Sequence, residues 1–431
     1  MGRIIVILLL VLLSAAANAQ DSWGHEYRGE LPVYIDSLQS RLDYPLAYRN
    51  YIRLLGGVGD VDSTVMAPST MRGLQQMAWK AAARMKIMEC MGVRPPLPED
   101  WDMRLLGEEQ RDGYKAQKIE FALSRWYRVK AYLLVPDGNR NDNGNDNGNG
   151  NDNDNRNDNR NGNDNGNGNA GRMPAVVVMH DHGAHLTIGK EKVVRPFGVS
   201  PEVMADADAW VEQLYEGQYL GDYLARNGFV VLAIDMPLWG ERGRAEGADR
   251  KKYDIIAGNM MMAGVNLCAF THYDDLASID FLASLPFVDA DRIGVAGLSI
   301  GAYRSWMAAA LSDKVRAVCA VCWMVSTDAQ LTTKYGRKEN GGFANTIPGL
   351  RNWLDYPDIA SLVAPRRMLI VAGSEDKLFP LPGVEKSFGI MRDVWKAFDA
   401  SDNLSAHILK QKHECTKENQ RMILEFLKGM K

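Results

Sequence analysis

The 431-residue chain has little of several features that define common protein classes. Its five cysteines cannot all pair, so a scaffold held together by a full set of disulfides is excluded. The net charge of −4 comes from 50 basic and 54 acidic residues, and this balance gives no basic footprint for nucleic acid. Residues that build a core are abundant, because 46% of the chain is hydrophobic. The composition therefore indicates a large globular protein without nucleic-acid partners.

The apolar stretch at the start of the chain is short. Ile4 to Leu13 follows the basic Arg3 and has about half of the roughly twenty residues needed to span a bilayer. Small residues from Ala15 to Ala19 then form an A-x-A site, so residues 1–19 are predicted to be a secretory signal peptide cleaved after Ala19. A buried N-terminal helix or strand is the alternative interpretation. No cysteine stands at the cleavage point, so a lipid anchor is not indicated. We expect a periplasmic or secreted protein without stable membrane insertion.

Two of the cysteines, Cys319 and Cys322, have a C-x-x-C spacing. They lie inside the apolar run VRAVCAVCWMV. Residues three apart in a strand point to opposite faces of a sheet, which is unsuitable for a shared metal or redox site. Both residues are therefore predicted to be core thiols.

The pattern from residue 20 to residue 110 is mostly that of helices and loops, and it predicts an N-terminal helical extension. Its clearest element is a helix from Met71 to Met91, whose methionines recur at helical spacing and are interpreted as packing residues. Strand-like segments begin at Tyr114 and predict a β-hairpin over residues 114–136. Residues 111–431 are predicted to form the main domain.

An asparagine-rich run interrupts this domain between two strand-like segments. Every odd-numbered residue from Asn139 to Asn169 is asparagine, and neither face of the alternation is apolar. Because the run cannot bury surface and a long surface loop costs little closure entropy, residues 139–169 are predicted to be a disordered insertion within one domain. A calcium loop is the alternative, but Asn163 stands where the glutamate at the twelfth position is needed.

After the insertion, short apolar segments alternate with helical ones. Near-continuous runs of valine, isoleucine, alanine and leucine are typical of strands that are buried on both faces. The fold class is therefore predicted to be α/β, with a mostly parallel sheet covered by helices on both faces. The expected strands are residues 174–180, 229–236, 292–299, 314–323, 366–373 and 405–411. The expected helices are residues 211–228, 274–285, 301–312 and 416–429. Residues 327–365 are expected to pass over the strand ends, where the active sites of such folds lie.

The strongest motif lies where one of these strands meets the next helix. Gly297-Leu298-Ser299-Ile300-Gly301 matches G-x-S-x-G and has the strand–turn–helix context in which such a serine is the nucleophile. The glycines make room for a strained turn that lifts the hydroxyl above the sheet edge. The N-terminus of the following helix favours a developing oxyanion. A glycine-rich turn with an incidental serine is the alternative interpretation.

A nucleophilic serine needs a histidine as its base. In hydrolases with this motif the order along the chain is nucleophile, acid, histidine, and only His407 and His413 follow Ser299. His407 falls within an expected strand, whereas His413 falls in the turn before the last helix. Since a catalytic histidine must reach the sheet edge from a loop, His413 is predicted to be the base.

The acid is expected to follow a strand between the serine and the histidine. The segment MLIVAGSEDKLFP offers Glu375 and Asp376, and Asp376 is preferred because it stands at the usual place after the glycine turn. Asp328, which follows the previous strand, is the alternative. The acid would fix the imidazole tautomer and stabilise the imidazolium.

The segment HDHGAH, residues 180–185, ends the strand after the insertion. A loop at this place normally supplies the second N–H of an oxyanion hole, and the first comes from the residue after the nucleophile. The oxyanion hole is therefore predicted to consist of the Ile300 and Ala184 N–H groups. A metal cluster built from the histidines and the aspartate of residues 180–185 is the alternative.

These residues resemble those of a known family. The segments that carry the resemblance are HDHGAHLTIGKEK, DMPLWGERG, GLSIGAYRSWMAAALSDKVRAVCAVCWM, DIASLVAPRRMLIVAGSEDKLFP and HEC. They look like the dienelactone-hydrolase-like branch of the α/β-hydrolases, which includes acetyl xylan esterase-like exported serine esterases. The resemblance covers about residue 114 to the C-terminus, apart from the asparagine-rich run. It implies an α/β-hydrolase fold, a triad of Ser299, Asp376 and His413, and ester hydrolysis. Dienelactone hydrolases themselves use a cysteine nucleophile, where this chain has serine.

The expected protein is an exported serine carboxylesterase that needs no cofactor or metal. Its expected substrates are small-molecule or polysaccharide esters, such as the acetyl esters of plant polysaccharides. Trp239, Arg242 and Trp323 match positions near the carboxyl edge of the sheet and are candidate substrate contacts. One alternative is an exported peptidase of the prolyl-oligopeptidase type, although the chain lacks a long repeat domain for a propeller. The other is a catalytically silent binding protein on a hydrolase scaffold, which the three competent triad residues argue against.

Overall fold

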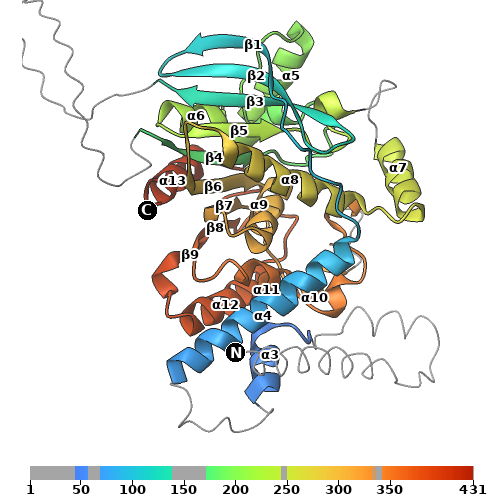
Figure 1. Cartoon of the computed structure of the whole chain (residues 1–431), viewed down its shortest axis with the longest axis vertical. Helices are drawn as coiled ribbons and strands as arrows, with labels where there is room; N and C mark the ends of the chain where they lie inside the picture. Colours follow the sequence, from blue (N-terminus) through green and yellow to red (C-terminus); the bar gives the residue numbers. More distant parts are fainter. Residues whose placement is uncertain are drawn as a thin grey trace, which may run out of the picture.

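The computed structural model describes residues 44–56, 68–137, 171–243, 250–332, 335 and 342–430 (Figure 1). The predicted signal peptide and the asparagine-rich run lie outside the described residues.

A single nine-stranded sheet forms the centre of the described structure. Its order is β1-β2-β3-β5-β4-β6-β7-β8-β9, which runs from top to bottom in Figure 1. The contacts between β1, β2, β3 and β5 are antiparallel, and all contacts from β5 to β9 are parallel. The predicted mostly parallel α/β sheet is therefore confirmed. The strands are β1 Arg104–Arg111, β2 Tyr114–Ala122, β3 Arg128–Pro136, β4 Met173–Met179, β5 Val230–Ile234, β6 Val288–Leu298, β7 Val315–Val321, β8 Arg367–Gly373 and β9 Leu404–Leu409.

Helices cover both faces of this sheet. One hydrophobic core lies between the sheet and α4, α8, α9 and α12, and a second core lies between the opposite face and α5, α6 and α13. The helices are α3 Tyr48–Gly56, α4 Pro68–Met91, α5 Pro201–Tyr215, α6 Leu220–Arg226, α7 Arg250–Met262, α8 Leu267–Ser284, α9 Ile300–Leu311, α10 Thr327–Gln330, α11 Tyr356–Ser361, α12 Leu381–Ala397 and α13 Lys417–Lys428. Short 3-10 turns are η1 Lys190–Lys192, η2 Gly240–Arg242, η3 Gly342–Asn345, η4 Leu350–Asn352 and η5 Ser401–Asn403.

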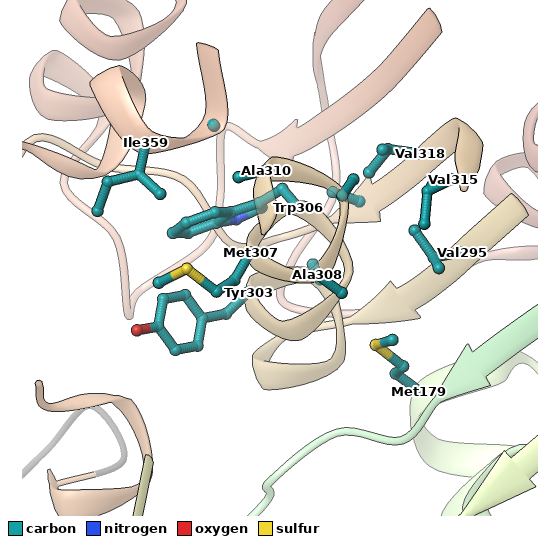
Figure 2. Close-up of a cluster of buried hydrophobic side chains, with 14 of the residues drawn as sticks. Met179, Val295, Tyr303, Trp306, Met307, Ala308, Ala310, Val315, Val318 and Ile359 are labelled. Carbon is teal, nitrogen blue, oxygen red and sulfur yellow. The ribbon is translucent and has the colours of Figure 1, made fainter. Parts of the chain in front are cut away.

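Helix α9 is the central packing element of the first core. All of its residues from Ile300 to Ala310 are buried. Figure 2 shows the side chains of Trp306 and Met307 on this helix, with Val318 of β7 on one side and Ile359 of α11 on the other. Burial on every side fixes α9 firmly, so the turn that precedes it has a rigid support.

The helices that precede the sheet share its core. The indole of Trp79 in α4 is fully buried and donates a hydrogen bond of 2.8 Å to the Leu46 carbonyl. Ile87, two turns further along α4, is also fully buried in the first core. The predicted helix 71–91 is therefore present as α4. The sheet, however, begins at β1 and thus before residue 111. The sequence RLLGEEQR of this edge strand lacks the alternation of a half-buried strand, and its side chains are mostly exposed.

One predicted helix is divided into two. Residues 211–228 were expected to be continuous, but α5 ends at Tyr215 and α6 begins at Leu220. Glu216 adopts a left-handed conformation with φ of 53°, its N–H bonds to the Val211 carbonyl, and Gly217 follows with φ of 74°. This pair of left-handed residues turns the chain, and glycine tolerates that conformation at no steric cost.

The flanks of the asparagine-rich run belong to the same sheet. Strand β3 precedes the run, β4 follows it, and both pair with β5. The strands on either side of the run therefore belong to one sheet, and the division of the chain into domains stays a prediction. No single helix in the described ranges is long and apolar enough to cross a membrane. One pair, Lys252–Met262 with Leu267–Ser284, passes that test only jointly and is bent by 88°.

Candidate active site

The predicted nucleophile sits in a strained turn between β6 and α9. Ser299 has φ of 57° and ψ of −124°, a region that residues with a side chain rarely adopt. Its N–H donates a hydrogen bond of 2.8 Å to the Val321 carbonyl at the end of β7. The serine side chain is partly exposed, unlike those of its neighbours. This geometry is the one expected of a G-x-S-x-G elbow.

The two glycines of the motif are needed for close packing. A Cβ at Gly297 would lie 2.6 Å from the Met179 carbonyl oxygen, and a Cβ at Gly301 would overlap the same oxygen. The carboxyl end of β4 therefore presses directly against the first turn of α9. Only glycine at both positions lets these two backbones approach.

The predicted base and acid are hydrogen-bonded to each other. His413 Nδ1 lies 2.7 Å from Asp376 Oδ2, and the Asp376 side chain is only 2% exposed. The other carboxylate oxygen, Oδ1, accepts a bond of 2.8 Å from the Leu378 N–H. Since an ionised carboxylate can only accept, Nδ1 of His413 carries the proton and Nε2 is left as an acceptor. Among the described residues His413 bonds to Asp376 and not to Ser299, and bonds of this kind often tighten only when substrate binds.

The two alternative residues lie in other contacts. His407 is on β9, where its Nε2 bonds to the Ser405 hydroxyl at 2.7 Å. Asp328 forms an ion pair of 2.8 Å with Lys386. The structure therefore pairs Asp376, and not Asp328, with the histidine in the loop between β9 and α13.

Ser299, Asp376 and His413 follow β6, β8 and β9 at the carboxyl edge of the parallel strands, with β7 between them. Cys322, the first residue after β7, places its Sγ within 4.8 Å of both a carboxylate oxygen of Asp376 and a ring nitrogen of His413. The ring of Phe379 stacks on His413 at 5.9 Å. No sequence motif identifies Cys322 or Phe379 as a site residue. Their positions are the only indication in the sequence: Cys322 directly follows a strand, and Phe379 lies close to Asp376 along the chain.

The two predicted oxyanion donors differ in their surroundings. Ile300 is the first residue of α9, so its N–H has no acceptor within the helix and faces the turn of Ser299. The Ala184 N–H donates 2.9 Å to Nδ1 of His182, and Ala184 has φ of 54°. The Ala184 donor is therefore already used by a side chain of its own loop. The loop begins beside the elbow, because a Cβ at Gly301 would lie 3.0 Å from the His180 carbonyl oxygen.

The histidines of this loop bind different partners. His180 is fully buried, its Nε2 accepts from the Met236 N–H at 2.9 Å, and burial lowers its pKa well below the usual range, with the charges of Arg304 and Lys192 adding to the effect. His182 accepts from Ala184, as described above, and His185 bonds to Asp206 at 2.7 Å. These contacts give each imidazole a structural role in ordering the loop.

One buried lysine, Lys192, holds the same loop, and a second, Lys190, forms a charge cluster next to it. The sequence analysis identified neither residue. Lys192 Nζ donates to the carbonyls of Asp181 at 3.2 Å and His182 at 3.0 Å. Lys190 Nζ lies 2.8 to 2.9 Å from three carboxylates, those of Glu191, Asp235 and Glu241. The only sequence signal was the charged pattern GKEK next to apolar residues.

Of the three candidate substrate contacts, Trp239 and Trp323 are buried and Arg242 is partly buried. Trp239 is 1% exposed and packs edge-on against the His182 ring at 4.9 Å. Arg242 forms an ion pair of 2.8 Å with Asp274. Trp323 is 3% exposed and packs on the Tyr303 ring at 4.6 Å. Both indole faces are covered by protein, so the structure assigns these residues to packing and ion pairing, not to an open surface for a sugar ring.

A strained serine elbow with a histidine–aspartate pair at the carboxyl edge of a parallel sheet defines a hydrolase of the α/β class. The sequence profile of the Abhydrolase family matches residues 206–428, which is more than half of the chain. The chain belongs to this family, and the resemblance to α/β-hydrolases is confirmed.

Among relatives, the chain is 31% identical over 235 residues to a provisionally named hydrolase, YtaP, of Bacillus subtilis (strain 168). The match covers 54% of this chain and 70% of that protein. Solved structures of similar fold include a provisionally named acetyl xylan esterase from Bacteroides fragilis NCTC 9343, with a TM-score of 0.56 and 19% identity over 78% of this chain and 76% of that chain. A glucuronoyl esterase from Solibacter usitatus has a TM-score of 0.52 and 14% identity over 82% of this chain and 93% of that chain. Methylesterase BT1017 has a TM-score of 0.53 and 16% identity, over 91% of this chain and 67% of that chain. At these identities the structural likeness shows the fold.

Proposed function

We propose that this chain is a serine carboxylesterase that works through an acyl-enzyme, with Ser299 as nucleophile, His413 as base and Asp376 as the acid that orients it. The observation that carries the proposal is the 2.7 Å contact between His413 Nδ1 and Asp376 Oδ2, at the sheet edge where Ser299 stands in its strained turn. A histidine with this tautomer offers Nε2 as an acceptor for the proton of a serine hydroxyl.

The reaction follows from these positions. Ser299 Oγ forms a bond to the ester carbonyl carbon while His413 Nε2 takes the hydroxyl proton. The tetrahedral intermediate then breaks its bond to the alcohol oxygen, which leaves with the proton from His413. Water attacks the acyl-enzyme in the same manner, and the acid is released as Ser299 regains its proton. Asp376 accepts from Nδ1 throughout and stabilises the imidazolium.

The developing oxyanion needs donors close to the elbow. The Ile300 N–H and the N-terminus of α9 supply one such site. The loop after β4 is the source of the second donor, and Ala184 serves only when its N–H leaves His182. Each donor of this kind contributes about 3–4 kcal/mol to the transition state in a dry site.

We further propose that the substrates are esters on carbohydrates and that the protein is exported. Three structures of similar fold bear the names of an acetyl xylan esterase, a methylesterase and a glucuronoyl esterase, which suggests this substrate class. Export is suggested by the pattern of residues 1–19.

A labelling experiment tests the assignment of the nucleophile. Treatment with an organophosphonate ester, followed by mass spectrometry of peptides, should place a single adduct on Ser299 and abolish hydrolysis of 4-nitrophenyl acetate. Ser299→Ala should lose the adduct and at least about three orders of magnitude in kcat. The matched control is Ser305→Ala on the same helix, whose buried hydroxyl contacts the Gly301 carbonyl at 2.7 Å and the Met179 sulfur at 3.6 Å. Wild-type turnover in Ser299→Ala would refute the mechanism.

A substrate panel tests the class of ester. Hydrolysis of 4-nitrophenyl esters should fall from acetate to octanoate, and acetate or methanol should be released from acetylated xylan or methyl-esterified pectin. A lipase-like pocket would instead favour long chains, because each buried methylene contributes about 0.8 kcal/mol. Rates that rise toward octanoate, with no release from any glycan, would leave the triad but exclude a carbohydrate esterase.

A further inference from the structure

Cys322 occupies a fixed position between the nucleophile and the histidine loop. It is the first residue after β7, and its N–H donates 2.7 Å to the Val371 carbonyl of β8. Its φ of 54° turns the side chain away from the direction that a continuing strand would give it. The residue is 1% exposed. Burial, with the nearby Asp376 charge adding to it, raises the pKa of the thiol to about 12, so the group is a neutral S–H donor.

The thiol contacts the backbone on both sides of the predicted base. Cys322 Sγ lies 3.7 Å from the Lys412 carbonyl oxygen and 3.6 Å from the Glu414 carbonyl oxygen. These are the residues immediately before and after His413. The Gln411 side-chain amide in turn donates to Sγ at 3.7 Å. The sulfur thus lies against the backbone of residues 412–414, the part of the loop that presents the imidazole.

The other contacts of this loop lie mostly away from the imidazole. Gln411 and Asn419 exchange two amide hydrogen bonds of 3.0 Å, which tie the start of the loop to α13. The Cys415 N–H bonds to the Leu214 carbonyl at 2.8 Å and fixes the end of the loop. Within the loop, the Glu414 carbonyl accepts from the Gln411 amide and the Lys412 carbonyl from the Glu414 N–H, both at 3.1 Å. Cys322 adds a contact to the same two carbonyls from the end of β7.

We propose that Cys322 is a positioning residue for His413: its sulfur packs against the two carbonyls that flank the histidine, shares its single S–H between them, and so keeps the imidazole aligned between Asp376 and Ser299. The proposal rests on the proposed function, because alignment matters only if His413 is the base. A neutral sulfur suits this place. It is large enough to reach both carbonyls at the distances of weak S–H hydrogen bonds, and it brings no charge next to Asp376.

Loss of this contact should affect turnover more than binding. A displacement of about 1 Å in a catalytic group can cost on the order of 100-fold in rate, while contacts that bind the substrate elsewhere are unchanged. Cys322→Ala should therefore lower kcat by about tenfold or more and leave KM within about twofold. The rate of organophosphonate labelling of Ser299 should fall by a similar factor, because that reaction also depends on the base.

Cys319→Ala is the matched control. Cys319 is on β7 itself, is fully buried and packs in the same core as Cys322. Its replacement removes a thiol from the same core, but among the described residues the contacts to the Lys412 and Glu414 carbonyls belong to the Cys322 sulfur and not to that of Cys319. We expect a lower melting temperature with kcat close to wild type. Cys322→Ser should lie between wild type and Cys322→Ala, since the hydroxyl keeps a donor but the shorter C–O bond cannot reach both carbonyls.

The outcomes separate this inference from the proposed function. Wild-type kcat in Cys322→Ala, or an equal loss of kcat in Cys319→Ala, would overturn the positioning role of Cys322. The esterase mechanism would still stand if Ser299→Ala were inactive. If Cys322→Ala does not fold, Cys322→Ser decides alone: reduced kcat at unchanged KM supports the role, and full turnover overturns it. An active Ser299→Ala would defeat both proposals.

Discussion

The buried charge cluster around Lys190 yields the sharpest stability prediction. The lysine side chain is 0% exposed, and its Nζ is surrounded by carboxylates of Asp235 and Glu191, which are 0% and 4% exposed, and of the more exposed Glu241. The Lys190 N–H also donates 2.7 Å to the Asp235 carboxylate. Burial alone would lower the pKa of the lysine, but the three carboxylates outweigh it and leave that pKa raised. The cluster connects the loop after β4 to the end of β5.

Replacement of Lys190 by methionine keeps the apolar stem and removes the charge. Asp235 and Glu191 would then be buried without the lysine that forms their ion pairs. Removal of one partner of a buried pair typically costs about 3–5 kcal/mol, because the other charge remains desolvated. The matched control is Lys428→Met, which breaks an exposed pair of 3.0 Å with Glu425 and should cost at most about 0.5 kcal/mol.

The loss of unfolding free energy in Lys190→Met should depend on pH. Burial raises the pKa of Asp235 to about 6 in the native protein even with Lys190 opposing it, and loss of the lysine should raise that pKa further. A carboxyl group whose folded pKa exceeds its unfolded pKa leaves the fold most stable at low pH, and this stability is lost as the pH rises through the folded pKa. The difference between wild type and Lys190→Met should therefore be small near pH 5 and largest at pH 8.

Urea unfolding at pH 5 and pH 8, followed by circular dichroism and tryptophan fluorescence, measures this difference. The reasoning would be refuted if Lys190→Met lost no more stability than Lys428→Met at pH 8. It would also be refuted if the deficit of Lys190→Met grew on acidification, because the buried carboxylates could not then be its cause.

The remaining predictions concern the candidate site. His413→Ala should lower kcat/KM for 4-nitrophenyl acetate by about three orders of magnitude, whereas His407→Ala should have little effect, and the reverse pattern would assign the base to the strand. Asp376→Asn should reduce kcat by about 10²–10⁴-fold by permitting the wrong imidazole tautomer, and Asp328→Asn should not, since its carboxylate pairs with a lysine elsewhere. Gly301→Ala should lower the melting temperature, with a loss of about 1–3 kcal/mol in unfolding free energy, because its Cβ would overlap the end of β4; an unchanged melting temperature would contradict the close approach.

The sequence was most informative where a strand is buried on both faces. Strands β4, β5, β7 and β8 and the second half of β6 are mostly apolar, because helices cover them on either side, and these segments were predicted. The start of β6, VDAD, is charged and was not predicted. Strand β1 was missed for the opposite reason. It is an edge strand with mostly exposed side chains, so its sequence lacks the alternation of apolar and polar residues that would predict a strand paired with β2. The break between α5 and α6 was also missed, since the pattern YEGQYL continues a helical period through a single glycine.

The candidate site divides in the same way. Ser299, His413 and Asp376 could be predicted because their chemistry constrains both residue type and order along the chain. Trp239 and Trp323 were chosen as candidates because they are aromatic and lie near the strand ends. Neither property predicts whether the ring is exposed to solvent or covered by other side chains. Both prove to be buried, because Trp239 packs against His182 and Trp323 against Tyr303.

The C-x-x-C pair shows how local backbone conformation limits such predictions. Cys319 and Cys322 were correctly expected to be free buried thiols, but not to lie on one face. Strand β7 ends at Val321, and the positive φ of Cys322 places its side chain in the same core as that of Cys319. A two-residue alternation holds only while the strand lasts. The end of a strand is also where an α/β fold builds its site, so the residue whose orientation a pattern predicts least well is the one that reaches His413.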